Sequence, residues 1–203
     1  MRAERSPDPA RRNPESTKAI LEAALALARD EGWTGVSIEG IAARAGVGKR
    51  TIYRWWPSKG AVVLDAYVSR LRDTPHMSAQ AASTEDLRAD LVLMLTETWG
   101  MVSDSLPLLA ALIGEAQHDR DLAGQLWEQL IAPSSEPVQA RIRLAQDQGE
   151  ITADVDPFRA AELVYGQIYL RLLVTPKHLD ANFLEDCVDL ALHGLRARPD
   201  ASP

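Results

Sequence analysis

The sequence contains one cysteine, Cys187, among 203 residues. A single thiol cannot form a disulfide within the chain, and it excludes cysteine-rich zinc ribbons and fingers. No apolar stretch approaches the roughly 20 residues that a membrane helix needs; the nearest candidate, Leu91–Leu95, is followed by Thr96 and Glu97. The N-terminal segment also lacks the apolar core of a secretory signal. These absences favour a cytoplasmic protein that does not associate with a membrane.

The common catalytic motifs are missing as well. There is no Gly-x-Ser-x-Gly elbow, phosphate-binding loop, dinucleotide fingerprint or His-Glu-x-x-His motif. The four histidines are scattered, and Glu115 with His118 is the only pair worth checking for a metal, although a surface polar pair explains it better. We therefore expect no enzymatic activity, no cofactor and no metal centre.

Charge is distributed unevenly along the chain. Residues 1–72 hold 13 Lys/Arg against 8 Asp/Glu, a net charge of +5, whereas residues 73–203 hold 9 against 21, a net charge of -12. Such a difference can arise by chance, but a basic N-terminal part on an acidic remainder favours an anionic partner at that end alone.

The apolar residues recur with a helical period, and no alternating strand pattern has a useful length, so the predicted fold class is all-α. We expect a flexible arm over 1–13, an N-terminal domain over 14–72 that begins with three helices, and a larger helical domain over 73–203. Caps, glycines and prolines predict helices over 14–32, 38–45, 49–56, 59–73, 84–103, 107–117, 119–131, a segment ending at 148 after a break at Pro133 and Pro137, 157–174 and 180–196.

The segment 37–59 predicts two short helices joined by a tight turn at Gly46. With about 100° per residue, Ile52 and Trp56 fall on one face of the second helix, and Arg50 and Arg54 lie about 160° and 200° away from Ile52. Trp56 is therefore predicted to be in the core. The two arginines would present donors to base edges in the major groove of DNA.

Residues Val36 to Lys59 resemble the helix-turn-helix of TetR-type transcriptional regulators. The features that carry the resemblance are the Ile-Ala pair at 41–42, Ala-Gly-Val at 45–47, Thr-Ile-Tyr at 51–53 and an aromatic before the Ser-Lys step at 58–59. The resemblance covers residues 14–72; the remainder matches only in the number and length of its helices. Gly48 stands where a small hydroxyl residue is common, and Trp55 where a smaller ring is usual.

The resemblance implies a role for each matching position. It implies contacts to the groove and to phosphates from Thr51, Tyr53 and Trp55, base reading by Lys49 and Arg50, phosphate binding by Lys59, and a helix cap near a phosphate at Ser37. Together with Arg54, these are the predicted DNA-binding residues. Arg11 and Arg12 could reach a minor groove, but a disordered leader explains them more simply.

The resemblance also implies a homodimer on a palindromic double-stranded operator and a small-molecule effector. The helix over 157–174 is apolar on nearly all sides, which indicates that other helices pack against it on two sides. The expected dimer interface comprises Leu163, Gly166, Leu170, Leu173, Leu184, Val188 and Leu192, with packing inside one subunit as the alternative. Six residues are candidates for lining the ligand pocket, with plain core as the alternative: Trp99, Leu112, Trp127, Leu130, Tyr165 and Tyr169.

The sequence therefore predicts a DNA-binding repressor that a small molecule releases from its operator. A DNA-binding dimer that is controlled by a protein partner, or that is not regulated by a ligand, stays open as an alternative. An enzyme or carrier would need a convergent polar cluster in the helical body, which the sequence does not display.

Overall fold

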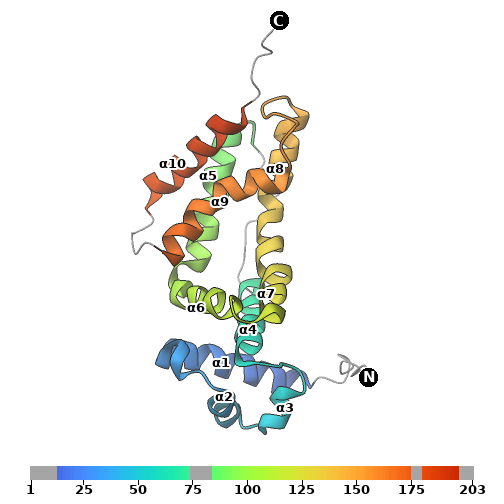
Figure 1. Cartoon of the computed structure of the whole chain (residues 1–203), viewed down its shortest axis with the longest axis vertical. Coiled ribbons are helices and arrows are strands. Elements are labelled where there is room, and N and C mark those ends of the chain that lie inside the picture. Colours follow the sequence, from blue (N-terminus) through green and yellow to red (C-terminus); the bar gives the residue numbers. More distant parts are fainter. Residues whose placement is uncertain (1–12, 74–83, 175–179, 197–203) are drawn as a thin grey trace, which may run out of the picture. The chain divides into compact units, whose positions relative to one another are not determined.

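The computed structural model describes residues 13–73, 84–174 and 180–196. Over these ranges the chain is helical and has a single isolated bridge, between Ile151 and Arg196, which agrees with the predicted all-α class (Figure 1). The predicted arm over 1–13, apart from Asn13, lies outside the described residues. The helices are α1 (Pro14–Gly35), α2 (Ile38–Ala45), α3 (Lys49–Tyr53), α4 (Lys59–Asp73), α5 (Leu87–Val102), α6 (Leu106–Ala116), α7 (Arg120–Leu126), α8 (Ala132–Asp147), α9 (Pro157–Leu173) and α10 (Ala181–Leu195).

The helices begin where polar caps predict. The Asn13 side chain accepts hydrogen bonds from the backbone N–H groups of Glu15 (3.0 Å) and Ser16 (3.2 Å). Asp156 accepts from Phe158 and Arg159 in the same way, at 3.0 and 3.1 Å. In both cases a proline follows the cap, where its missing N–H costs no intrahelical bond.

Two compact units divide the chain. The first comprises residues 1–74 and 107–129, and the second comprises residues 75–106 and 130–203. The predicted division at 72–73 follows sequence order, whereas the contacts place α6 and α7 with the N-terminal helices. The sequence pattern gave no sign of this, because packing between distant segments leaves no local signature.

In the first unit, α1 packs against α2 and α4. Its core contains Ile20, Ile41, Ile52 and Trp56, each no more than 3% exposed, which confirms the predicted core position of Trp56. We call residues 49–56, which comprise α3 and the three residues after it, the α3 segment. The indole N–H of Trp56 donates to the Asp65 carboxylate at 2.9 Å and so joins the end of this segment to α4.

The contact between α4 and α7 is close at one point. A Cβ atom at Gly60 would lie 2.7 Å from Cδ2 of Leu122, which is itself 1% exposed. Glycine therefore allows α4 to approach α7 at this position.

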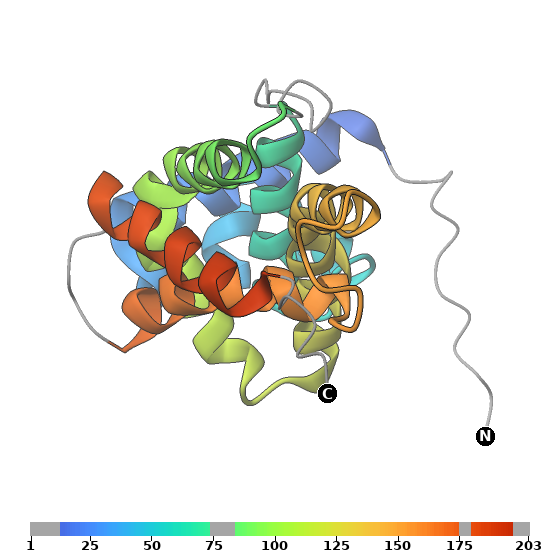
Figure 2. The ribbon, with the colours of Figure 1, turned by 90° about the horizontal axis from the view of Figure 1, so that it is seen from above.

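The second unit is built from α5, α8, α9 and α10 around one apolar cluster. The helix α10 lies against both α5 and α9 (Figures 1 and 2). At the surface, Arg88 of α5 pairs with Asp189 (2.6 Å) and Glu185 (3.0 Å) of α10.

Two expectations about helix boundaries were wrong. The predicted break at Pro133 and Pro137 is absent: a π-helical turn over Trp127–Ile131 leads directly into α8, which contains Pro137. Pro133 lies in the first turn of α8, where a missing N–H is tolerated. Near Pro137, the hydroxyls of Ser134 and Ser135 donate to the carbonyls of Leu130 and Ala132.

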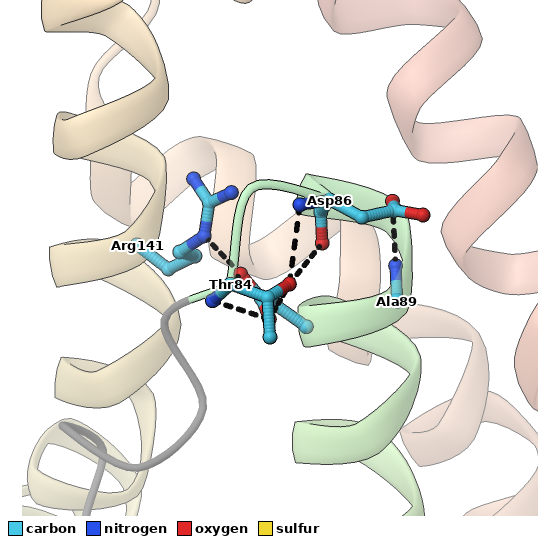
Figure 3. Close-up of polar contacts among 5 residues, drawn as sticks. Thr84, Asp86, Ala89 and Arg141 are labelled. Carbon is cyan, nitrogen blue, oxygen red and sulfur yellow. Dashed lines mark hydrogen bonds and ion pairs between the residues drawn. The ribbon is translucent and has the colours of Figure 1, made fainter.

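The helix predicted from residue 84 instead begins at Leu87, with Asp86 as its cap. Thr84 is drawn out of the helix because its backbone N–H and its hydroxyl donate to the carboxylate of Asp90 (Figure 3).

Candidate nucleic-acid interface

The turn between α2 and α3 has the geometry that the glycine predicts. Gly46 adopts a left-handed conformation with φ 67° and ψ 30°, which suits a residue without a side chain. The backbone N–H of Val47 then closes the turn on the Ala42 carbonyl at 3.0 Å. Gly48 begins α3 without a side-chain cap, as expected from the missing hydroxyl.

The side chains of the α3 segment lie on two opposite faces, an inner face that is buried and an outer face that is exposed. Ile52 is 0% exposed and Trp56 is 3% exposed, so both anchor the segment in the first unit. The side chains on the outer face are all exposed: Lys49, Arg50, Thr51, Tyr53 and Arg54. Their exposure confirms the predicted outward orientation of Arg50 and Arg54. This strip combines positive charge with hydrogen-bond donors, as contacts with phosphates and base edges require.

Trp55 lies beside this strip and is half-buried. The guanidinium carbon of Arg54 lies 5.4 Å from the centre of the Trp55 ring, within the range of a cation–π interaction. The indole thus limits the positions of Arg54.

Lys49 is held by an acid on the preceding helix. Its ammonium lies 3.0 Å from Oε1 of Glu39, across the helix-turn-helix. The hydrogen bond between the two groups raises the pKa of Lys49 and lowers the pKa of Glu39. A phosphate that approaches Lys49 therefore also meets the negative charge of Glu39.

Lys59 has an internal role that the sequence did not reveal. Its ammonium donates to the carbonyls of Trp33 (3.3 Å) and Val36 (3.2 Å) and lies 4.7 Å from the centre of the Trp33 ring. An ammonium has three N–H donors, so one remains for a phosphate. Ser37 caps α2 by accepting from the Gly40 N–H at 3.1 Å, which leaves its own hydroxyl proton to donate.

A groove of about 740 Å³ adjoins the outer strip. Its walls come from the start of α1 and from the α3 segment, and include Ser16 and Thr17 together with Arg50 and Arg54. The sequence reasoning missed the α1 hydroxyls. The sequence indicates that Ser16 and Thr17 lie in the first turn of a capped helix. It does not indicate that the start of this helix lies beside the α3 segment.

The six candidates for a ligand pocket are not gathered within either unit. Leu112 and Trp127 belong to the first unit, where Leu112 is fully buried and Trp127 is 46% exposed. In the second unit, Trp99 and Tyr165 border the apolar cluster, Leu130 is buried and Tyr169 is half-buried. Burial raises the pKa of the Tyr165 phenol. The pocket stays a prediction.

The predicted dimer interface falls into two groups. Gly166 and three leucines of α9 are exposed: Leu163 at 52%, Leu170 at 55% and Leu173 at 45%. On α10, however, Leu184, Val188 and Leu192 are 6% exposed or less and belong to the core of their own unit. The apolar face of α10 is covered by α5 and α9 within the same unit. The place of these three residues in a dimer interface stays a prediction.

None of the described helices is both long and apolar enough to cross a membrane. In the same described part of the chain, no cluster of three or more His, Cys, Asp or Glu residues could hold a metal ion.

Comparisons with known proteins agree with this geometry. Residues 20–66 match the bacterial regulatory proteins of the tetR family, and residues 81–191 match the tetracyclin repressor-like C-terminal domain. The uncharacterized HTH-type transcriptional regulator YdeS of Bacillus subtilis is 31% identical over 89% of each chain. The DNA-binding transcriptional repressor TetR of Mycobacteroides abscessus is 32% identical over 68% of this chain and 72% of its own length.

Solved structures show the same fold. The TetR family transcription regulator SCO0332 aligns with a TM-score of 0.70 and 33% identity over 90% of this chain and all of its own. Thermus thermophilus FadR, a TetR-family repressor solved with lauroyl-CoA, aligns with a TM-score of 0.72 and 21% identity over 92% of this chain and 98% of its own. Family matches cover both the helix-turn-helix and most of the chain that follows it, so the chain belongs to the TetR family of bacterial transcriptional regulators.

Proposed function

We propose that this regulator is a cytoplasmic repressor that binds a palindromic operator as a homodimer and leaves it when a small-molecule effector binds. The observation that carries the proposal is the α3 segment, which presents exposed cationic and donor side chains around the buried anchors Ile52 and Trp56.

Within this strip, Arg50 and Arg54 are proposed to read bases, because a guanidinium can donate two parallel hydrogen bonds to guanine. Lys49, Thr51, Tyr53 and Trp55 contribute contacts to the groove and the phosphates. Ser37 and Lys59 each keep one donor for a phosphate, and Ser16 and Thr17 extend the surface onto α1.

The exposed face of α9 supports the dimer. Leu163, Leu170 and Leu173 are each about half exposed, on a helix whose other side is buried in the second unit. A second copy would cover this face by two-fold symmetry. The two copies of α3, acting as recognition helices, would then meet successive major grooves about 34 Å apart, and the operator would be palindromic.

The proposed regulation by a small molecule draws on two relatives. The Mycobacteroides abscessus relative is named a repressor, and FadR was solved with lauroyl-CoA, but FadR shares the fold with this chain rather than close sequence similarity. A DNA-binding dimer controlled by a protein partner, or not regulated by a ligand, remains the second candidate.

A gel-shift experiment with DNA that flanks the gene tests DNA binding. Arg50→Ala and Arg54→Ala should each weaken specific binding by about 1–3 kcal/mol if the arginines read bases. Arg143→Ala is the matched control, since it removes one exposed positive charge from α8 in the second unit. Equal losses in all three variants would show a general charge effect and contradict base reading.

A further inference from the structure

Among the described residues, Arg141 is the one basic residue that is buried. It lies on α8, and its side chain is 2% exposed. Its Nε donates to Oδ2 of Asp90 on α5 at 2.6 Å. A guanidinium has five N–H donors, so this contact uses one of them.

In the part of the chain that the structure describes, the terminal nitrogens of Arg141 have no hydrogen-bond partner. Its terminal nitrogens Nη1 and Nη2 are both buried and donate to no acceptor among the described residues. In Figure 3 they point away from the side chain of Thr84. The Asp90 carboxylate is also engaged elsewhere, because Thr84 donates to it from its backbone N–H (3.0 and 3.1 Å) and from its hydroxyl (2.8 Å).

The geometry of the unpaired end of the guanidinium is specific. With Nε fixed on Asp90, Nη1 and Nη2 form the end of the guanidinium fork, which matches the two oxygens of a carboxylate. Thr84 holds Asp90, and Asp90 holds Arg141, so the fork is oriented before anything binds. Leaving a buried charged donor without an acceptor is costly, and an acceptor from outside the described chain would remove that cost.

The surroundings limit the kind of acceptor. The residues that flank the pair on α5 and α8 belong to the buried apolar cluster: Leu87, Leu91, Val138, Ile142 and Ala145. A group with two negative charges would be much more costly to bury here than a group with one, because Asp90 already neutralises Arg141. A single carboxylate on an apolar body fits these conditions.

We propose that Arg141 binds the carboxylate of a small, mainly apolar acid within the second unit. Such an acid would be the effector, and this part of the inference rests on the proposed regulation by a small molecule.

The test measures binding by the full-length protein, with calorimetry and thermal unfolding. The probes are benzoate and octanoate, their uncharged counterparts benzamide and octanamide, and inorganic phosphate. We expect at least one acid to bind and to raise the midpoint of thermal unfolding further as its concentration increases above its dissociation constant. The amides and phosphate should not raise the midpoint. The inference is overturned if no acid binds, if an amide binds as well as its acid, or if phosphate alone binds.

Arg141→Met should weaken acid binding by about 10- to 100-fold, because it removes a charge-assisted pair of hydrogen bonds. Arg143→Met, two residues along α8 and exposed, is the matched control and should keep the affinity of the unchanged protein. Undiminished binding by Arg141→Met would overturn the inference. If that variant does not fold, Arg141→Lys replaces it, and the comparison of acids with amides on the unchanged protein needs no variant.

Operator binding without any acid tests the proposed function separately. A protein that binds its operator but no acid contradicts the inference alone. A protein that binds an acid through Arg141 but no DNA contradicts the proposed function alone.

Discussion

At the scale of single residues, ion pairs decide which charges are available to a partner. The pair between Lys49 and Glu39 lies on the face that we propose for DNA, and both side chains are more than half exposed. Glu39 therefore both holds a cation and places a negative charge near the phosphates.

We predict that Glu39→Gln tightens operator binding about two- to fivefold at low salt, because it releases Lys49 and removes a repulsive charge. The dependence of affinity on salt should become steeper as Lys49 replaces one more counterion on the DNA. Fluorescence anisotropy at several salt concentrations measures both effects. The control is Glu22→Gln, which makes the same charge change on α1; equal tightening there would contradict a specific role for Glu39.

The buried pair of Asp90 and Arg141 makes a prediction about stability. Burial alone would raise the pKa of Asp90, but hydrogen bonds from Arg141 and Thr84 outweigh it, so that the pKa lies below its ordinary value. A carboxyl group whose pKa is depressed by folding stabilises the protein above its unfolded pKa of about 4, and this contribution is lost as the pH falls through the folded value.

Asp90→Asn should therefore lower the free energy of unfolding by about 3–5 kcal/mol at pH 7, where it leaves the Arg141 charge buried and uncompensated. The difference from the unchanged protein should shrink as the pH falls below about 4. Urea denaturation at pH 7 and pH 3.5 measures it. Asp189→Asn, which breaks an exposed pair with Arg88, should have a much smaller effect at pH 7.

At the scale of elements, the packing of α4 on α7 depends on the absence of one side chain. Gly60→Ala should destabilise the protein by about 1 kcal/mol, because the new methyl group would displace Cδ2 of the buried Leu122. Gly124→Ala on α7 is the control: nothing lies within 4 Å of its Cβ position, so it should be neutral or stabilising. Thermal unfolding compares the two, and a stabilised Gly60→Ala variant would contradict the close contact.

The sequence predicted those elements whose signals are local. Asn13-Pro14 and Asp156-Pro157 marked helix starts, and the helical period placed Ile52 and Trp56 inside and Arg50 and Arg54 outside. Interactions between distant segments were not predictable, including the hydrogen bonds of Lys59 to Trp33 and Val36 and the pair of Asp90 with Arg141. The apolar pattern of α10 predicted a covered face but could not say whether the cover comes from the same chain or a second one.

At the scale of the whole molecule, the proposed function requires two copies. We predict that Leu170→Glu prevents dimer formation, because it places a charge in the middle of the exposed apolar face of α9. Sedimentation velocity should show a dimer for the unchanged protein and a monomer for the variant, and operator affinity should fall accordingly. Leu144→Glu, on an exposed part of α8, should remain dimeric. A monomeric unchanged protein would contradict the proposed assembly.

The hydrogen bonds made by two residues that follow α3 have a mechanical consequence for DNA recognition. Trp56 joins the end of the α3 segment to Asp65 on α4, and Lys59 joins the first residue of α4 to the junction between α1 and α2. A tilt of α4 must therefore either break these bonds or carry the α1–α2 junction and the α3 segment along as a rigid body. The angle of α4 would then determine the orientation of the exposed face of the α3 segment relative to DNA.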